Sequence, residues 1–317
     1  MSLRDELAAV LAGKDLDRAL ARNLANELNK VAEASPARTR KRKAKKSPTL
    51  PKHLVIPDTQ VRPDVPTVHL EWIGQWIVDE LAGDDLTIIH LGDHWDMPSL
   101  SSYDRGKASM EGRRVADDLI AGNRGFDLLN APLARYNVEH PRKKWEPRKV
   151  FLHGNHENRI TRAVEETAQL DGLLSLDLLN AAEHGWEVHP FLDVVTIHGV
   201  SYSHYFYAPL SGRPYGGQNI DTRLKTIGHS FTMGHQQVLM YGVRTLPTGG
   251  MQHGLVAGAC YLVDEVYRGP QANAEWRGVI LCNQVENGSY DPMFVSLDYL
   301  CRRYEGVRLS EFMEGLT

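Results

Sequence analysis

Short apolar runs alternate with helical patterns through most of this chain, beginning near residue 53. The runs HLVI, LTIIHL and KVFL start at residues 53, 86 and 149, and each is short enough to predict a buried strand. Between them, residues 65–83 and 111–135 carry apolar positions at helical spacing, and Gly83 is a stop signal for the first helix. Strand, helix, strand, helix, strand is the order of parallel βαβ units, so the pattern predicts an α/β fold.

The second half of the chain contains further strand-like segments. After another helical stretch, residues 191–207 predict a hairpin that turns at Gly199, and residues 229–238 predict a strand that ends in polar residues. From there on, short β-like runs alternate with Gly and Asn turns, for example over residues 277–300. We therefore expect mostly strands and turns in the C-terminal third.

The N-terminal segment has a different character from the rest of the chain. Residues 3–11 predict a short helix that Gly13 ends, and a second helix follows with Asp15 placed to cap it. The apolar positions of the second helix recur at helical spacing at Leu16, Leu20, Leu24, Leu28 and Val31. A helical hairpin over residues 1–35 is too small to bury much surface by itself, so we expect it to pack on the body, on another chain or on nucleic acid.

A basic run separates this hairpin from the body at residues 53–317. Residues 36–52 hold eight Lys and Arg residues and no acid, while the formal net charge of the whole chain is −4, so the remainder sums to −12. The basic residues are Arg38, Arg40, Lys41, Arg42, Lys43, Lys45, Lys46 and Lys52. Such a run predicts either a solvated flexible linker or an arm that binds nucleic acid. We take nucleic acid as the expected partner of residues 38–52.

Cysteine usage and hydropathy indicate a cytoplasmic protein. Cys260, Cys282 and Cys301 show neither CxxC spacing nor a disulfide framework, which favours a reducing compartment. No stretch approaches the ~20 apolar residues that a membrane span needs, and the N-terminus lacks a signal-peptide core. We therefore expect no membrane partner, and the sequence does not indicate an oligomeric state.

Polar residues suited to binding metals follow five of the predicted strands. They are Asp58 and Gln60, Asp93 and Asp96, Asn155 with His156 and Glu157, His204, and His235 with Gln237. In α/β folds the carboxyl ends of parallel strands form the ligand crevice, and carboxylate, amide and imidazole groups that converge there can bind divalent metals. Gly92, Gly154 and Gly234 would let the backbone turn sharply and approach these groups closely.

The order of these motifs resembles the calcineurin-like metallophosphoesterase superfamily. The series PDTQ, GDHWD, GNHE, a single histidine and GHQQ spans residues 54–237. The resemblance implies a four-layer αββα sandwich in which two metal ions activate water against a phosphate ester. It places Asp58 at the first metal and Asp93 between the two. Asn155, His204 and His235 would hold the second metal, with His156 as the proton donor or charge stabiliser at the leaving oxygen.

Two positions depart from the family pattern at the same metal site. Gln60 and Gln237 stand where the family usually has histidine, and an amide oxygen suits harder ions better than it suits zinc. The first site should therefore bind weakly and favour Mn²⁺ or Mg²⁺. If the two glutamines do not lie there, His94 is the nearest replacement ligand. In the hairpin, the resemblance selects His204 over His198 as the ligand.

Other residues near the motifs have more ordinary explanations. Asp96 and Glu157 are expected to orient the metal ligands, and His90, His94 and His153 to form hydrogen bonds in the core or at its rim. Arg159 is a candidate phosphate contact, although a plain surface arginine is the more common outcome. Arg213, Arg223 and Lys225 are further candidates, in a predicted Gly-rich loop.

Two further segments could interact with nucleic acid. The aromatic residues between 202 and 215 supply either stacking surface for bases or core packing, and strand alternation assigns at least half of them to the core. They are Tyr202, Tyr205, Phe206, Tyr207 and Tyr215. The basic stretch 141–149 precedes a strand, so it should lie at the opposite edge of the sheet as a solvated loop.

These observations predict a metal-dependent phosphoesterase, with a DNA or RNA phosphodiesterase or nuclease as the leading function because of the basic arm. Within the same family, a protein phosphatase or a small-nucleotide phosphatase is the alternative. A third hypothesis is a non-catalytic nucleic-acid-binding protein with an empty first metal site. The presence of His156 and of all the second-metal ligands argues against the third.

Overall fold

The computed structural model describes residues 50–264, 271 and 275–316. The predicted helical hairpin and most of the basic run, including residues 38–49, lie outside the described residues. The segment from Thr49 to Thr317 is one compact unit, and it contains both sheets and the candidate site.

The first sheet contains the three strands predicted at the start of the body. Its strand order is β13 (Ser289–Ser296), β12 (Gly278–Glu286), β1 (Lys52–Ile56), β2 (Leu86–His90), β3 (Arg148–Leu152) and β4 (Glu187–His189). The strands β1 to β4 are parallel, whereas β12 pairs antiparallel with both β1 and β13. The sheet is therefore mixed, with a parallel half built from the predicted βαβ units.

The second sheet is also mixed. Its strand order is β10 (Leu239–Thr245), β11 (Met251–Ala257), β9 (Phe231–Met233), β6 (Val200–Ser203) and β5 (Val195–Ile197). The predicted hairpin is confirmed as β5 and β6, with Gly199 at φ +85° in the turn between them. A small hairpin of β7 (Tyr207–Ala208) and β8 (Arg213–Pro214) leaves this sheet after β6.

Six α-helices occur among the described residues. They are α3 (Val68–Leu81), α4 (Val115–Glu139), α5 (Asn158–Glu166), α6 (Ile220–Ile227), α8 (Leu297–Glu305) and α9 (Leu309–Glu314). Single 3₁₀ turns lie at Pro98–Leu100, Ala108–Met110, Ala168–Leu170 and Leu176–Leu178. Both helices predicted between the first three strands are confirmed as α3 and α4, and Gly83 follows the first at φ +92°.

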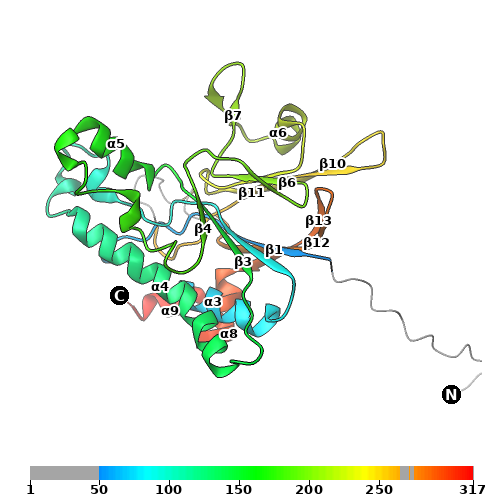
Figure 1. Ribbon diagram of the computed structural model, residues 1–317, viewed down its shortest axis with the longest axis horizontal. Helices are drawn as coiled ribbons and strands as arrows, with labels where there is room; N and C mark the ends of the chain where they lie inside the picture. Colours follow the sequence, from blue (N-terminus) through cyan, green and yellow to red (C-terminus); the bar gives the residue numbers. More distant parts are fainter. Residues whose placement is uncertain (1–49, 265–270, 272–274, 317) are drawn as a thin grey trace, which may run out of the picture. The chain divides into compact units, whose positions relative to one another are not determined.

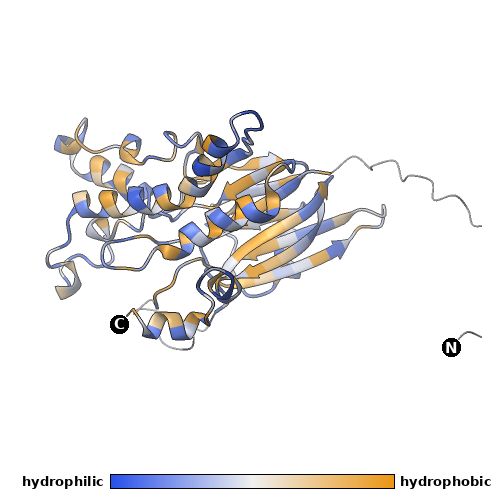
Figure 2. Ribbon diagram, turned by 90° about the horizontal axis from the view of Figure 1, so that it is seen from below, coloured by the Kyte–Doolittle hydropathy of each residue, from blue (hydrophilic) through white to orange (hydrophobic). Residues whose placement is uncertain are grey.

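Strand alternation places the core on both faces of the first sheet. On β1, Leu54 and Ile56 pack with α3 and α4, whereas Val55 points into the layer shared with the second sheet. Helices α3, α4, α8 and α9 lie on one side of the two sheets, and α6 lies on the other (Figure 1). Figure 2 shows long hydrophobic stretches in the strands and mixed hydrophobic and hydrophilic positions along the helices. The chain is thus α/β, with two mixed sheets face to face and helices outside them, compatible with an α/β sandwich.

The C-terminal third departs from its prediction. The long strands β12 and β13 replace the expected short runs, and two helices, α8 and α9, follow them. Buried Leu297, Leu300 and Cys301 have helical spacing, and the Ser296 side chain accepts the Tyr299 N–H at the start of α8. This capping serine, after a strand-like run, was the signal that would have predicted the change from strand to helix.

No helix among the described residues is both long enough and apolar enough to cross a membrane.

Candidate metal centre

The register of the strands brings the predicted site residues to one edge of the two sheets. In the first sheet Ile56 pairs with His90, and His90 pairs with Phe151, so the three parallel strands end at the same level. In the second sheet Ser203 pairs with Met233, which aligns the ends of β6 and β9. Since each site residue follows one of these ends within a few positions, the polar groups converge there.

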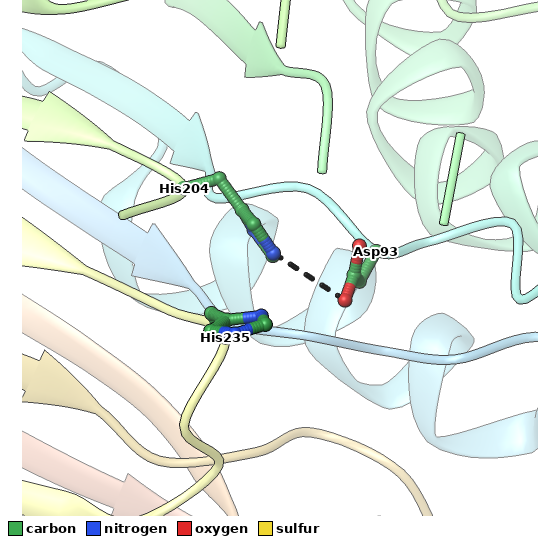
Figure 3. Close-up of side chains that lie close together, drawn as sticks. All are labelled: Asp93, His204 and His235. Atoms are coloured by element: carbon green, nitrogen blue, oxygen red, sulfur yellow. Dashed lines mark ion pairs between the residues drawn. The ribbon is translucent and has the colours of Figure 1, made fainter. Parts of the chain in front are cut away.

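Three of the predicted ligands form a cluster. One ligand atom each from Asp93, His204 and His235 lies within 4.8 Å of the others (Figure 3). His204 Nδ1 is 2.7 Å from the Leu91 carbonyl, which fixes the ring so that Nε2 faces Asp93 Oδ2 at 3.4 Å. The side-chain oxygen of Asn155 is 3.0 Å from the same Nε2. The four ligands predicted for the second metal therefore lie together.

Two buried carboxylate oxygens have no hydrogen-bond partner here. Asp58 Oδ1 accepts the His235 N–H at 3.0 Å and Asp93 Oδ1 accepts the His156 N–H at 2.9 Å, but Oδ2 of both residues is buried without a hydrogen bond. Asp93 Oδ2 is still in ion-pair contact with His204 Nε2 at 3.4 Å, whereas Asp58 Oδ2 has no such contact among the described residues. A buried charged oxygen without a partner is costly, and a cation removes that cost. Carboxylate, imidazole and amide donors together fit a divalent ion with mixed N and O ligands.

Glycine is required beside both carboxylates. A Cβ atom on Gly154 would lie 2.1 Å from Asp93 Oδ1, and a Cβ atom on Gly234 would lie 2.5 Å from Asp58 Oδ1. Gly92 has φ +94°, and a Cβ atom there would lie 2.4 Å from the Leu152 carbonyl. The expectation that these glycines allow close approach of the backbone is confirmed.

Four of the predicted ligands have a left-handed backbone. The φ angles are +42° at Gln60, +51° at Asp93, +65° at His235 and +56° at Gln237. Few non-glycine residues adopt this conformation, which costs of order 1–3 kcal/mol and clusters at functional sites. The backbone is thus strained at four of the predicted ligands, and this conformation sets the direction of their side chains.

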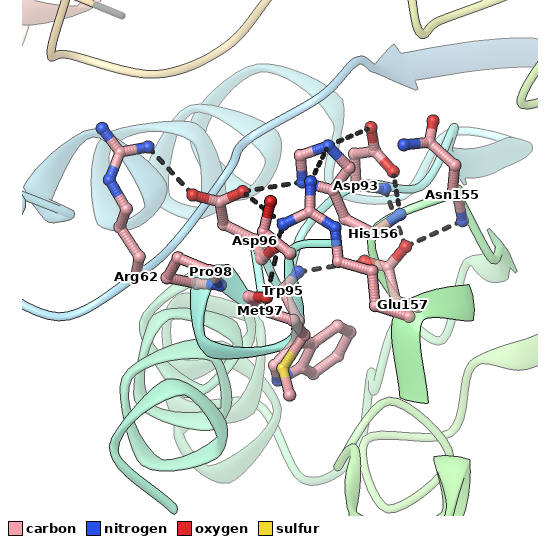
Figure 4. A network of polar contacts seen from close by, with 12 residues as sticks. Arg62, Asp93, Trp95, Asp96, Met97, Pro98, Asn155, His156 and Glu157 are labelled. Atoms are coloured by element: carbon pink, nitrogen blue, oxygen red, sulfur yellow. Dashed lines mark hydrogen bonds and ion pairs between the residues drawn. The ribbon is translucent and has the colours of Figure 1, made fainter. Parts of the chain in front are cut away.

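Glu157 holds the turn that carries Asp93. Its carboxylate accepts backbone N–H groups of Gly154, Asp93, His94 and Trp95 at 2.7, 3.0, 2.6 and 2.9 Å (Figure 4). Burial and the charge of Asp93 raise the pKa of Glu157 to about 7, and the N–H donors oppose that shift. Glu157 is completely buried and accepts hydrogen bonds through both oxygens, so it holds the turn of Asp93 in place, and its expected role of orienting metal ligands stays a prediction.

His156 lies in a chain of polar contacts. Its Nδ1 is 2.7 Å from Asp96 Oδ1, and Arg62 donates to the other Asp96 oxygen at 3.0 Å (Figure 4). Burial alone would lower the pKa of His156, but the nearby Asp93 and Asp96 carboxylates raise it above its usual value. Asp96 therefore orients the imidazole of His156, whereas the prediction had it orient the metal ligands. Arg62 was missed, although it follows the first strand end by only a few residues.

Arg159 is not an ordinary surface arginine. Its side chain is 14% exposed, and it donates to the Asp96 carbonyl at 2.7 Å. Its other terminal nitrogen is 3.0 Å from His156 Nε2. The expectation of an ordinary surface arginine is wrong here. Helix α5 starts directly after the GNHE turn, so the side chain of Arg159, in its first turn, reaches back to His156.

Both glutamines predicted at the first metal site are buried, whereas the predicted replacement ligand His94 is engaged elsewhere. The Gln60 N–H donates to the Asp93 carbonyl at 2.8 Å, and the Tyr261 hydroxyl donates to Gln237 Oε1 at 3.1 Å, so both glutamines lie in the buried region of the site. His94 cannot replace them, because its ring nitrogens contact Thr59 Oγ1 at 2.7 Å and the Gly122 carbonyl at 3.0 Å. His94 as the fallback ligand is therefore wrong.

The neighbouring histidines also have structural roles. His90 contacts Thr59 Oγ1 through Nε2 at 3.3 Å and accepts the Gly92 N–H at 3.2 Å through Nδ1. His153 is buried. His198 forms a 2.8 Å contact with His53, so the selection of His204 from the hairpin agrees with the geometry.

The prediction that Arg213, Arg223 and Lys225 lie in a loop is wrong, because all three lie in regular elements. Arg223 lies in helix α6 and is buried. Its guanidinium donates to the Gln236 side chain at 2.5 Å and to the Gly216 carbonyl at 3.3 Å, so it holds the preceding loop. Arg213 is exposed on β8, and Lys225 is in α6.

At least half of the aromatic residues are buried, as expected. Tyr202, Tyr205 and Phe206 are buried in the core, and the Tyr205 ring also lies against His235 with centroids 4.6 Å apart. Tyr207 lies next to Tyr205 at 5.4 Å and is 39% exposed. The exposed part of this set is therefore beside the metal cluster.

The ionisable groups of the cluster shift one another's pKa values. Burial and the neighbouring Asp93 raise the pKa of Asp58 to about 6. Burial would raise the pKa of Asp93 as well, but His156 and His204 hold it well below its usual range. Burial would lower the pKa of His204, yet Asp93 and Asp58 raise it to about 9. The nearby carboxylates thus favour the protonated, positively charged form of His204, which faces them.

Comparison with protein-family models and with curated proteins finds no match for this chain. The fold and the geometry therefore stand by themselves: this is an α/β protein with two mixed sheets and a possible metal-binding triad of Asp93, His204 and His235.

Proposed function

We propose that this chain is a metal-dependent phosphoesterase of the calcineurin-like type, with phosphodiester bonds of nucleic acid as its substrate. The single observation that carries the proposal is the convergence of four ligand side chains beside a buried imidazole that an aspartate orients. The two face-to-face sheets with outer helices are compatible with the four-layer sandwich that the proposal requires.

Two divalent ions would be held by the residues at the strand ends. Asp93, Asn155, His204 and His235 form the donor set of one site, and Asp58 with Gln60, Gln237 and Asp93 forms that of the other. Bound there, the ions would supply Lewis-acid polarisation of the phosphate and lower the pKa of a water nucleophile. The buried Oδ2 atom of Asp58, which has no hydrogen bond or ion pair among the described residues, supports this assignment. We propose Mn²⁺ or Mg²⁺, because amide and carboxylate oxygens dominate the first site.

Side chains of the protein would then donate the proton and bind the phosphate. In hydrolysis, a water oxygen bonds to phosphorus, the bond to the leaving oxygen breaks, and that oxygen must gain a proton. His156 is suited to donate it from Nε2, because Asp96 holds Nδ1 and raises the basicity of the ring. Arg159 now contacts Nε2, and a phosphate oxygen is a stronger partner for its guanidinium than a neutral imidazole is. We infer that substrate draws Arg159 away, so that Nε2 is free to take up from solvent the proton that it then donates to the leaving oxygen.

The experiment that tests the proposal is a matrix of metals and substrates. Mn²⁺, Mg²⁺, Ni²⁺ and Zn²⁺ are each combined with a bis-aryl phosphodiester, an aryl phosphomonoester, and single- and double-stranded DNA. We expect metal-dependent hydrolysis of the diester and of DNA, and its loss in Asp93→Ala. The matched control is Asp171→Ala, which removes an exposed carboxylate from a turn. Turnover in Asp93→Ala equal to that of the control would refute the two-metal mechanism.

The same matrix separates the alternatives. Hydrolysis of the monoester alone would indicate a protein or small-nucleotide phosphatase. DNA binding without hydrolysis of any ester, under any metal, would indicate a non-catalytic binding protein. The nucleic-acid arm at residues 38–52 remains part of the proposal, because most of it lies outside the described residues.

A further inference from the structure

A pocket lined by arginines opens beside His156. It has a volume of about 200 Å³ and lies between α5 and residues 99–110. Its lining includes three arginines and three serines, namely Arg105, Arg159, Arg162, Ser99, Ser101 and Ser102. We call it the arginine pocket. Arg159 forms its inner wall and is 3.0 Å from His156 Nε2, so the pocket begins where the leaving oxygen would lie.

The arginine pocket carries a net positive charge. Its lining contains one carboxylate, that of Glu166, which pairs with Arg105 at 2.8 Å. Arg159 uses its guanidinium on backbone carbonyls and on His156. Arg162 is exposed and forms no ion pair with any residue in the described part of the chain. Arg159 also lies 3.7 Å from the Asp96 carboxylate. After Arg105 is balanced by Glu166 and Arg159 by Asp96, the guanidinium charge of Arg162 therefore remains to bind an anion.

The spacing of the two arginines fits successive phosphates. Arg159 and Arg162 are three positions apart in α5, so they occupy neighbouring places on one helix face. Residues at this spacing have Cβ atoms about 5–6 Å apart, and two long arginine side chains that start so close together can bind neighbouring phosphates of one strand. The pocket is also lined by Leu100, Met110 and Leu170, which offer apolar surface to a sugar or base.

We propose that the arginine pocket binds a second phosphate of the substrate, one nucleotide beyond the bond that is cleaved, on the leaving-group side. This inference rests on the proposed phosphodiesterase function. Arg162 binds the second phosphate, whereas Arg159 serves the phosphate at the metal centre. The pocket thereby selects strands of at least two nucleotides over isolated phosphodiesters.

The test compares three thymidine dinucleotides, which are dTpdT, pdTpdT and dTpdTp. The products of dTpdT hydrolysis, separated by chromatography, identify the nucleoside that leaves. If thymidine 5′-phosphate is released, the leaving nucleoside is the 5′ one and pdTpdT carries the extra phosphate on it. If the 3′-phosphate is released, dTpdTp does. The prediction for the favoured isomer is thus made before its kinetics are measured.

The kinetics are measured for wild type, Arg162→Gln, Arg162→Lys and Arg135→Gln. Arg135 is an exposed arginine of α4 outside this pocket, so its variant controls for the change in net charge. In wild type the favoured isomer should have a kcat/KM about three- to fivefold above that of dTpdT, as expected for one partly exposed charge pair. Arg162→Gln should abolish this ratio, whereas Arg162→Lys and Arg135→Gln should keep most of it.

Hydrolysis of the bis-aryl diester reports the metal centre alone and should be unchanged in Arg162→Gln. The ratio should also fall with added salt, because exposed charges are screened. An unchanged ratio in Arg162→Gln, or equal gains for both isomers, would overturn the inference while leaving the phosphodiesterase intact. Failure of all three dinucleotides and of the bis-aryl diester in wild type would overturn the proposed function, and this inference with it.

Discussion

Glu157→Gln isolates the interaction that shapes the turn carrying Asp93. Each carboxylate oxygen of Glu157 accepts two backbone N–H groups: Oε1 those of His94 and Trp95, and Oε2 those of Asp93 and Gly154. Glutamine has nearly the same shape, but one of its two terminal positions is an NH₂ group. Whichever way the amide is oriented, two backbone N–H groups then face another donor in a buried site.

The magnitude follows from those two lost acceptors. A buried donor without a partner costs about 1–3 kcal/mol, so the variant should lose roughly 2–6 kcal/mol of unfolding free energy. The matched control is Glu187→Gln, which makes the same chemical change. Glu187 accepts two hydrogen bonds from Arg148 at 2.9 and 2.7 Å, but its side chain is 49% exposed. An exposed pair contributes about 0–1 kcal/mol, so the control should stay close to wild type.

The assay is urea unfolding followed by circular dichroism, with chelator present so that metal binding does not contribute to stability. It is run at pH 8, because the pKa of Glu157 is raised to about 7 and the carboxylate must be ionised for the comparison. Metal affinity measured separately should also fall, since the turn carries Asp93. A loss of stability in Glu157→Gln no larger than in Glu187→Gln would refute the assignment of Glu157 as the holder of this turn.

Three further predictions concern the site and its surroundings. His156→Ala should keep its metals but lose roughly 10²–10⁴-fold in rate, the usual range for a positioned acid, and calorimetry that shows lost metals would mean the residue is a ligand. Replacing both Gln60 and Gln237 with histidine should tighten the weaker metal site, especially for Zn²⁺; a titration unchanged from wild type would mean that neither glutamine binds metal. Burial lowers the pKa of His69 to about 4, below its value of 6.5 in the unfolded chain. The unfolded state therefore takes up a proton first as the pH falls, and stability contributed by neutral His69 is lost from about pH 6.5 down to about 4. Between pH 7 and pH 5 this amounts to about 2 kcal/mol. His69→Gln, which cannot titrate but can still donate to the Cys260 carbonyl, should show a smaller loss in urea unfolding at the two pH values; an equal loss would assign the acid sensitivity to other groups.

The sequence by itself determined the elements whose pattern is local. Apolar runs of four to six residues predicted β1, β2 and β3, and helical spacing predicted α3 and α4, because burial of one face or of a whole strand leaves a period in the chain. The polar residues at the strand ends were also readable, since parallel strands in one sheet must end at a common edge. The grouping of His204 with His235 follows from that rule, whereas the approach of Asp93, which follows β2 of the other sheet, depends on how the two sheets pack.

Only the tertiary structure decided how individual side chains are engaged. Arg159 and Arg223 are both arginines near a predicted ligand, yet one reaches His156 and the other is buried under its own loop. Nothing local separates them, because the direction of a side chain depends on where its helix starts and on what packs above it. The four N–H groups that meet Glu157 come from two strand ends 60 residues apart in the chain, so the pocket they form exists only after β2 and β3 have paired.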